Sequence, residues 1–388
     1  MFDSFALSVR GSSHIRENIA RQDNTGTDTD PAGWAIAAVS DGHGGDDYFR
    51  SHIGSRFAVE SAMNSIKECL TEKKMVLDTL REGENAREKF FRRLASSILT
   101  GWRAYVDCFE EAVKTYEPSP QAAVVEFDFG TLTIQQQLPG GEDAFVQDGI
   151  SLAWEEAWCA EHEVKRSETR PERLYGCTLL VAVMAPEFCF SLQIGDGCCV
   201  SAYADGHTEM MISVEEEHTT NITDSLCEAR ALEKFKHTLL LAAEEKEGLA
   251  QAPQQTEKTA EAPDAEPPKA EEPKTEATEN VTPENEVPAE PQDTVPAQEP
   301  KEKSGTPFAA LPVGILLSSD GLFNSCNTAE DFLQFNRAVL ARMQPDGRDA
   351  FAGELAEHLA LRSKKGSADD ISMAILFRSD MDYDAMRR

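Results

Sequence analysis

The chain has 388 residues, 40% of them hydrophobic, and a formal net charge of −32 at pH 7. A chain of this length and composition can bury a sizeable core. Acidic residues outnumber lysine and arginine by 69 to 37, which argues against a surface for nucleic acid or an anionic membrane and suits divalent cations.

Neither export nor membrane insertion is indicated by the sequence. The N-terminal segment MFDSFALSVRGSSHIRE lacks the basic flank and continuous apolar core of an export signal. No later run reaches the roughly 18–20 apolar residues that a membrane span needs. The nine cysteines are scattered without a CxxC pair. We therefore expect reduced thiols in a cytoplasmic protein with no membrane or nucleic-acid partner.

Short apolar runs bounded by turn residues predict four strands before residue 245. These are WAIAAV (34–39), TLLVAVM (178–184), FCFSLQIGD (188–196) and CVSAYADG (199–206). Helical periodicity predicts helices over 48–70 and 86–116. Residues 117–148 are too irregular for an assignment.

Residues 245–305 are predicted to be a disordered insertion. The stretch 251–300 holds ten of the nineteen prolines, thirteen acids against three lysines, and no aromatic residue. Such a composition cannot bury enough apolar surface to offset chain entropy. The segment that follows is too short for an independent domain, so we expect one domain formed by 1–244 and 306–388.

The segment after the insertion predicts strand, helix, helix and strand. The strands are LPVGILLSSD (311–320) and ISMAILF (371–377), and the helices cover 328–343 and 347–362. Strands in antiparallel succession with helices in pairs indicate an α+β fold in which helices cover sheet layers.

Four carboxylates stand at the ends of predicted strands. Asp41, Asp196 and Asp320 follow apolar runs, and Asp369 precedes the last one. Strand ends on one sheet edge can converge, and converging carboxylates repel one another unless cations neutralise them. Magnesium and manganese prefer such oxygen ligands, whereas zinc would call for more histidine. Each acid could instead cap a turn, because Asp-Gly after a strand is a common turn signal.

Six motifs together resemble the metal-dependent PPM, or protein phosphatase 2C, family. They are RQDN (21–24), VSDGHGG (39–45), GCTLLVAV (176–183), IGDG (194–197), LLSSDGLFN (316–324) and SADDISMAIL (367–376), in the family's order. The resemblance covers roughly 1–235 and 306–380. It implies an antiparallel β-sandwich flanked by pairs of helices, in the layer order αββα.

The resemblance also implies roles for individual acids. Asp41 resembles the carboxylate that bridges two metals, and Gly42 the residue whose carbonyl binds one of them. Asp320 and Asp369 resemble the acids that complete the second metal site. Asp23 resembles the acid that holds water bound to the metals, which makes Asp41 and Asp23 the candidate catalytic residues.

Other positions depart from the family's pattern or are less clearly matched. Asp196 resembles the acid of a third, weaker metal site, but Asn324 stands where some members have a further aspartate, so a third ion is doubtful. Asp370 stands where the family often has asparagine. Gln22 replaces a glutamate, so metal affinity is expected to be lower, and His43 is expected to support the site without binding metal.

The group that contacts the substrate phosphate is not fixed by the sequence. Many family members use an arginine four residues before the position of Gln22, where this chain has Asn18. Arg16 and His14 are the nearby candidates, and each could equally be a solvated loop side chain.

The implied activity is hydrolysis of phosphate monoesters, most naturally phosphoserine and phosphothreonine on proteins, by water activated between two manganese or magnesium ions. The chain is expected to act as a monomer on a phosphorylated protein. One alternative is a catalytically weak or inactive phosphatase fold that binds a phosphoprotein as a regulatory module. Another is a metal-stabilised interaction protein in which the acids only form turns.

Overall fold

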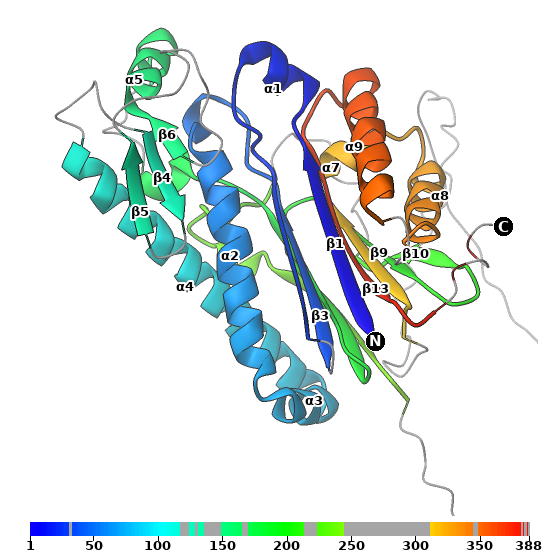
Figure 1. The fold of residues 1–388 in the computed structure, drawn as a ribbon. Helices are drawn as coiled ribbons and strands as arrows, with labels where there is room; N and C mark the ends of the chain where they lie inside the picture. The colour runs from blue at the N-terminus through cyan, green and yellow to red at the C-terminus, as the bar shows by residue number, and fades with distance from the viewer. Residues whose placement is uncertain are drawn as a thin grey trace, which may run out of the picture. The chain divides into compact units, whose positions relative to one another are not determined.

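Two five-stranded antiparallel sheets form the centre of the computed structural model (Figure 1). The first sheet has the order β1-β13-β12-β9-β10, and the second has the order β11-β8-β7-β3-β2. The first contains β1 (Phe2–Val9), β13 (Ile371–Arg378), β12 (Gly314–Ser318), β9 (Cys198–Ala202) and β10 (Thr208–Met210). The second contains β11 (Lys236–Leu241), β8 (Phe188–Ile194), β7 (Leu179–Met184), β3 (Trp34–Ser40) and β2 (Asn24–Asp30).

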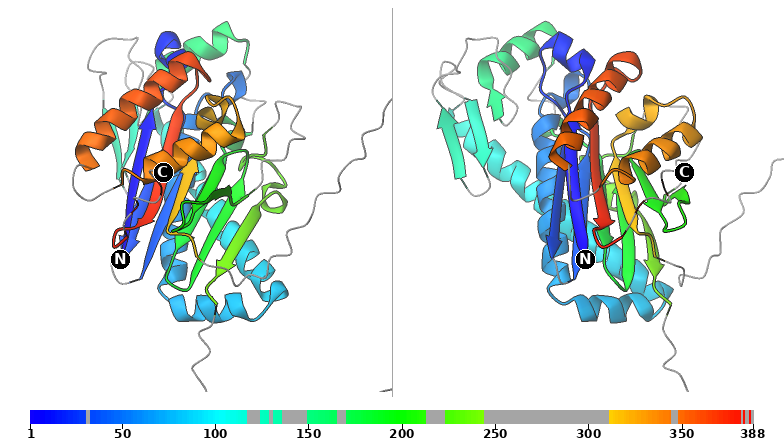
Figure 2. Two further views of the ribbon diagram at one scale, coloured as in Figure 1. Left: turned by 90° about the vertical axis from the view of Figure 1, so that its right-hand side faces the viewer. Right: turned by 45° about the vertical axis from the view of Figure 1, so that its right-hand side comes forward.

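Helices cover the outer face of each sheet, as Figures 1 and 2 show. On the second sheet lie α2 (Ser51–Leu70) and α4 (Glu84–Tyr116), joined by α3 (Lys73–Arg81). On the first lie α8 (Ala329–Leu340) and α9 (Arg348–Lys365). The shorter helices are α1 (Ser12–Glu17), α5 (Leu152–Glu161), α6 (Pro171–Leu174) and α7 (Asp320–Asn324). The predicted α+β sandwich flanked by pairs of helices is confirmed.

The alternation of side chains along each strand creates three hydrophobic layers, because successive residues of a strand point to opposite faces. In β3, Ala35, Ala37 and Val39 lie in the core between the two sheets. Ile36 and Ala38 point the other way, into the core beneath α2 and α4. Every one of these side chains is at most 2% exposed. Continuous apolar sequence is therefore required of a strand that is covered on both faces.

The strands missed by the sequence analysis lie at sheet edges or are short. β2 reads NTGTDTD and contains no large apolar residue, although it pairs with β3 along its whole length. Within the unassigned region 117–148, the structure describes β4 (Val124–Asp128) and β5 (Thr131–Gln135), which form a small sheet with β6 (Gly149–Ser151). Edge strands need not be apolar, so hydrophobic periodicity does not find them.

The structure describes residues 1–30, 33–116, 124–128, 131–135, 149–164, 170–212, 223–243, 311–343, 348–381, 383 and 386. The described residues within Met1–Ala243 and Pro307–Arg388 form one compact unit. The predicted disordered insertion, 245–305, lies outside the described residues and stays a prediction. Among the described residues, the helices do not combine the length and the hydropathy needed to cross a bilayer.

Candidate active site

The acids predicted from strand ends interact with one another in the structure. The pKa of Asp41 is raised well above its ordinary value, first by burial and then by the negative charges of Asp23, Asp320 and Asp369. The charge of Asp196 acts on both Asp320 and Asp369. The fold thus gathers five carboxylates, contributed by strand ends of both sheets.

Asp41 is held by the GCT motif on the neighbouring strand. The Asp41 N–H donates to the Thr178 hydroxyl at 3.0 Å, and the Thr178 N–H donates to the Asp41 carbonyl at 2.8 Å. The next residue, Gly42, is buried where a Cβ atom would lie only 2.7 Å from the Ser51 carbonyl oxygen and 2.8 Å from that of Gln22. Glycine is therefore needed here because the backbones approach too closely for a side chain.

Asp320 and Asp369 stand at adjacent strand ends of the first sheet. The Ser372 N–H donates to the Ser319 hydroxyl at 3.0 Å, which joins the end of β12 to the start of β13. Burial raises the pKa of Asp320 to about 6, with a further contribution from Asp196. The Asn324 amide donates to Asp320 at 2.8 Å and opposes that rise.

The second of these acids is more accessible. The side chain of Asp369 is 47% exposed and its pKa is raised, chiefly by burial of part of the carboxyl group. The N–H of Asp370 donates to Asp369 at 2.8 Å and favours the ionised form. Asp369 is also among the residues that line a cavity beside the cluster, whereas Asp320 is not.

Asp23 is the most deeply buried acid of the cluster. It is 1% exposed, and among the described residues neither carboxylate oxygen has a hydrogen-bond partner. The hydroxyls of Ser319 and Ser372 lie near enough to favour its ionised form without hydrogen-bond geometry. Burial, followed by the charge of Asp370, raises its pKa well above the ordinary value. A buried carboxylate without donors needs a proton, water or a cation.

A cavity of about 340 Å³ opens beside the cluster. Asp41, Gly42, Asp369, Gln22 and His14 are among the residues that line it. His14 is 8% exposed, and its Nδ1 atom lies 2.9 Å from Asp370 while its Nε2 atom lies 3.9 Å from Asp369. Burial lowers the pKa of His14, but the hydrogen bond and charge of Asp370, with the charge of Asp369, outweigh burial, so the pKa is raised.

Arg16 is not among the residues lining this cavity. Its side chain is 70% exposed, and its guanidinium contacts Glu17 at 2.8 Å. Of the two candidates for a phosphate contact, the structure therefore brings His14 to the cavity and leaves Arg16 in solvent.

His43 lies beside Gly176 of the GCT motif, and Asp196 follows the end of β8. The His43 ring packs edge-to-face on Tyr48 with 5.1 Å between ring centroids, and burial lowers its pKa, so the imidazole is neutral near pH 7. Asp196 accepts a hydrogen bond from the Thr223 hydroxyl at 2.6 Å. Cys177 of the GCT motif is fully buried, and burial raises the pKa of its thiol.

The donor set fits magnesium or manganese. All of the predicted ligands offer oxygen, and the buried Asp23 oxygens have no donor among the described residues. In the described part of the chain, no three acidic, histidine or cysteine side chains are already arranged around one ion position. Magnesium keeps several waters and is usually bound by one or two carboxylates. The oxygen donors of the cluster are therefore of the kind that magnesium or manganese can use.

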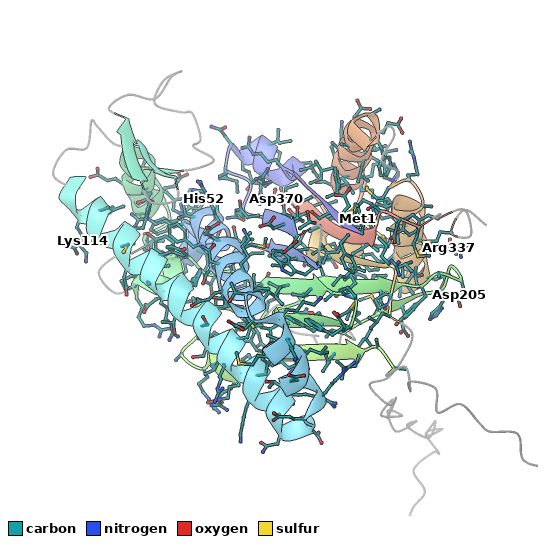
Figure 3. The ribbon with its side chains drawn as sticks, turned by 60° about the horizontal axis from the view of Figure 1, so that its bottom comes forward. Met1, His52, Lys114, Asp205, Arg337 and Asp370 are labelled. Carbon is teal, nitrogen blue, oxygen red and sulfur yellow. The ribbon has the colours of Figure 1, made fainter. Side chains whose placement is uncertain are left out.

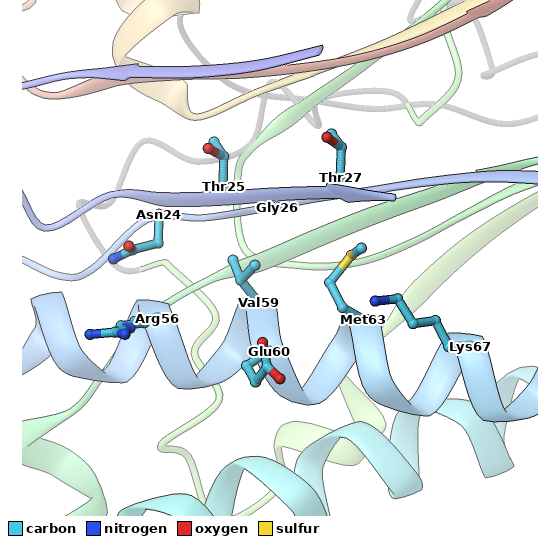
Figure 4. A pocket seen from close by; sticks show the side chains of 9 residues that line it. All are labelled: Asn24, Thr25, Gly26, Thr27, Arg56, Val59, Glu60, Met63 and Lys67. Atoms are coloured by element: carbon cyan, nitrogen blue, oxygen red, sulfur yellow. The ribbon is translucent and has the colours of Figure 1, made fainter. Parts of the chain in front are cut away.

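A second cavity, of about 270 Å³, lies between β2 and α2 (Figure 4). Val59 and Met63 of α2 reach toward Gly26, while Thr25 and Thr27 point away from the helix. None of the predicted site residues lines this cavity. We assign no role to it.

Two supporting residues were assigned no role by the sequence analysis. Thr178 fixes Asp41, and Asp370 accepts hydrogen bonds from the backbone of the segment that contains Asp23. The motifs GCTLLVAV (176–183) and SADDISMAIL (367–376) contain these residues, but neither motif shows which neighbour each residue contacts. Figure 3 labels Asp370 and also His52, which lies in the first turn of α2.

The sequence model of the protein phosphatase 2C family matches residues 10–360. The chain therefore belongs to the protein phosphatase 2C family, a family of metal-dependent phosphatases. A comparison with curated proteins finds no match.

Solved structures similar to the chain include three bacterial proteins. The serine/threonine phosphatase Stp1 from Staphylococcus aureus has 11% identity and a TM-score of 0.43, with 97% of this chain and 95% of that chain covered. The S. agalactiae serine/threonine phosphatase has 11% identity and a TM-score of 0.41, covering 97% and 99%. PppA, a regulatory component of T6SS in Pseudomonas aeruginosa, has 14% identity and a TM-score of 0.40, covering 97% of each chain.

Proposed function

We propose that the protein is a metal-dependent phosphatase that hydrolyses phosphoserine and phosphothreonine in proteins. The observation that carries the proposal is the cluster of Asp41, Asp23, Asp320 and Asp369 beside a cavity of about 340 Å³. This volume is at the small end of the about 300–1,000 Å³ usual for ligand sites. A phosphorylated side chain suits it, and the rest of a protein substrate would remain outside.

Two ions, manganese or magnesium, would be held by Asp41, the Gly42 carbonyl, Asp320 and Asp369. When bound, such ions lower the pKa of water and offset negative charge on phosphoryl oxygens. We assign no third ion, because Asn324 is neutral and its amide already donates to Asp320.

The chain's own residues would orient the reactants. Among the residues that the structure describes, neither buried oxygen of Asp23 has a hydrogen-bond donor, so both could accept from a water molecule, and cations nearby would favour the ionised form. His14 lines the cavity and would donate from Nε2 to a phosphate oxygen when protonated. The backbone N–H of His43 donates to the Gly176 carbonyl at 3.0 Å and so supports the loop after Asp41. Gln22 would accept or donate to water without adding charge.

The test is phosphate release from an aryl phosphate and from phosphoserine, phosphothreonine and phosphotyrosine peptides, with manganese, with magnesium and with chelator. Asp41→Asn should lower kcat by at least about 10²–10³-fold, the usual effect of removing one preorganised electrostatic contact. Asp28→Asn is the matched control, because Asp28 forms a partly exposed ion pair with Lys67 at 2.7 Å and lies outside the cluster.

Two results would count against the proposal. Full activity in chelator, or in Asp41→Asn with an intact circular dichroism spectrum, would exclude the metal-dependent mechanism. Tight phosphopeptide binding by a wild-type protein that is inactive with every divalent ion would favour the regulatory-module alternative. Because both ions act on one transition state, Asp41→Asn combined with Asp369→Asn should lose little more than the worse single variant.

A further inference from the structure

Asp370 is a buried carboxylate on which three segments of the site converge. It is 1% exposed and directly precedes β13. One carboxylate oxygen lies 2.5 Å from the Gly11 N–H donor and 2.9 Å from Nδ1 of His14. The other lies 2.5 Å from the N–H donor of Gln22 and 3.3 Å from that of Asp23. These partners belong to the β1–α1 connection, to α1 and to the segment before β2.

The four contacts require a group that only accepts hydrogen bonds. An ionised carboxylate has two accepting oxygens, whereas an asparagine amide has one oxygen and a donating NH₂ group. In either orientation, an amide at position 370 would direct NH₂ at the backbone N–H of Gly11 or at that of Gln22. The imidazole of His14 could adapt by moving its proton, but a backbone N–H cannot. The aspartate is therefore matched to its surroundings in a way that asparagine is not.

The same contact orients His14. Because Asp370 only accepts, the proton of the neutral imidazole lies on Nδ1. Nε2 then faces the other way, toward Asp369, and His14 lines the cavity. This arrangement is analogous to a histidine whose ring is fixed by a carboxylate on one nitrogen while the other nitrogen acts on a ligand.

We propose that Asp370 is a positioning residue that holds the His14 imidazole for the substrate phosphate and fixes the backbone that carries Asp23. The proposal rests on the proposed function, because it assigns the phosphate contact to His14. It also gives a reason for aspartate where the family often has asparagine: each carboxylate oxygen faces a backbone N–H, and an amide has only one accepting oxygen.

The loop that carries His14 has further anchors, so loss of the Asp370 carboxylate need not detach it. The Ser13 N–H donates to the Ala368 carbonyl at 3.0 Å, and the Ser12 N–H donates to the Ser363 hydroxyl at 3.0 Å. Arg10 donates to the His14 carbonyl at 2.9 Å. Asp370→Asn is therefore expected to fold.

The first experiment tests the pairing without metal or substrate. Protein labelled with ¹⁵N-histidine is compared as wild type, Asp370→Asn and the control Asp28→Asn in chelator, at a pH above the titration of His14. Long-range ¹H–¹⁵N spectra report which ring nitrogen carries the proton, and His14→Gln identifies the signal. We expect the Nδ1–H form in wild type and control, and a changed Nδ1 chemical shift in Asp370→Asn, because the charged acceptor is lost. An Nε2–H form in the wild type, or an unchanged Nδ1 shift in Asp370→Asn, would overturn the pairing whether or not the protein is a phosphatase.

The second experiment tests what the pairing does. With manganese, Asp370→Asn should raise both KM for an aryl phosphate and the inhibition constant of inorganic phosphate about tenfold, as expected for a lost hydrogen bond to a charged group. In His14→Gln, the further change Asp370→Asn should have little additional effect on these two constants. Fully additive losses, or a loss confined to kcat, would refute the action through His14. An inactive wild type would instead contradict the proposed function, and the spectra would still decide the pairing.

Discussion

Replacing Asp320 by asparagine is expected to stabilise the metal-free protein at pH 8, although the same change should abolish activity. In the metal-free protein the pKa of Asp320 is raised from 3.8 to about 6 by burial and then by the charge of Asp196. The folded state therefore holds the proton more tightly than the unfolded state. Ionisation of Asp320 consequently opposes folding, and this penalty grows as the pH rises from about 4 to above 6.

The size of the effect follows from that shift. At 1.36 kcal/mol per pKa unit, the penalty at pH 8 is about 3 kcal/mol, falling to about 2 kcal/mol at pH 5 and to less than about 1 kcal/mol at pH 4. Asparagine removes the penalty but disturbs the 2.8 Å hydrogen bond from Asn324, which contributes about 1 kcal/mol. We therefore expect a net gain in the free energy of unfolding of about 2 kcal/mol at pH 8, with the sign reversing between pH 4 and 5.

Denaturant unfolding followed by circular dichroism, in chelator at several pH values, measures this difference. The control Asp28→Asn should change stability by less than about 1 kcal/mol, because its ion pair with Lys67 is partly exposed. Manganese at about 100 times its dissociation constant should stabilise the wild type by about 2.7 kcal/mol and the variant by less. A metal-free Asp320→Asn protein that is less stable than wild type at pH 8 would refute the electrostatic reasoning.

Three further predictions concern other parts of the chain. Arg50 is fully buried, and two of its guanidinium nitrogens bind Glu155 at 2.7 and 2.6 Å. Arg50→Met should therefore lower the free energy of unfolding by about 3–5 kcal/mol, because it leaves a buried carboxylate without its partner. An unchanged thermal midpoint would contradict this. Gly54→Ala should destabilise the protein, because the Cβ added in α2 would lie 2.0 Å from the Tyr175 carbonyl oxygen. A rise in the free energy of unfolding near the about 1 kcal/mol usual for glycine-to-alanine changes in a helix would show that this contact relaxes. Gln22→Glu should lower the manganese concentration needed for half-maximal activity by adding negative charge at the cavity, and a titration showing an equal or higher requirement would indicate that the side chain faces elsewhere.

The local pattern of apolar and polar residues was sufficient to predict the buried strands and the long helices. β3, β7, β8, β12 and β13 are covered on both faces, so their sequences are apolar runs, and all of them except β7 have an aspartate within two residues of one end. The helices α2 and α4 bury one side against the second sheet and show the matching periodicity. The class of fold and the positions of the acids followed from these local signals.

The contacts among distant segments depended on the tertiary structure. Asp370 accepts from Gly11 and Gln22, which are separated from it by 359 and 348 positions in the sequence. No periodicity encodes such partners, because they meet only when β13 pairs with β1 and the segment before β2 lies alongside. The same holds for the choice between His14 at the cavity and Arg16 in solvent. The sequence supplies the charged groups and their order, whereas burial and neighbours, which exist only in the folded chain, decide which charge faces the site.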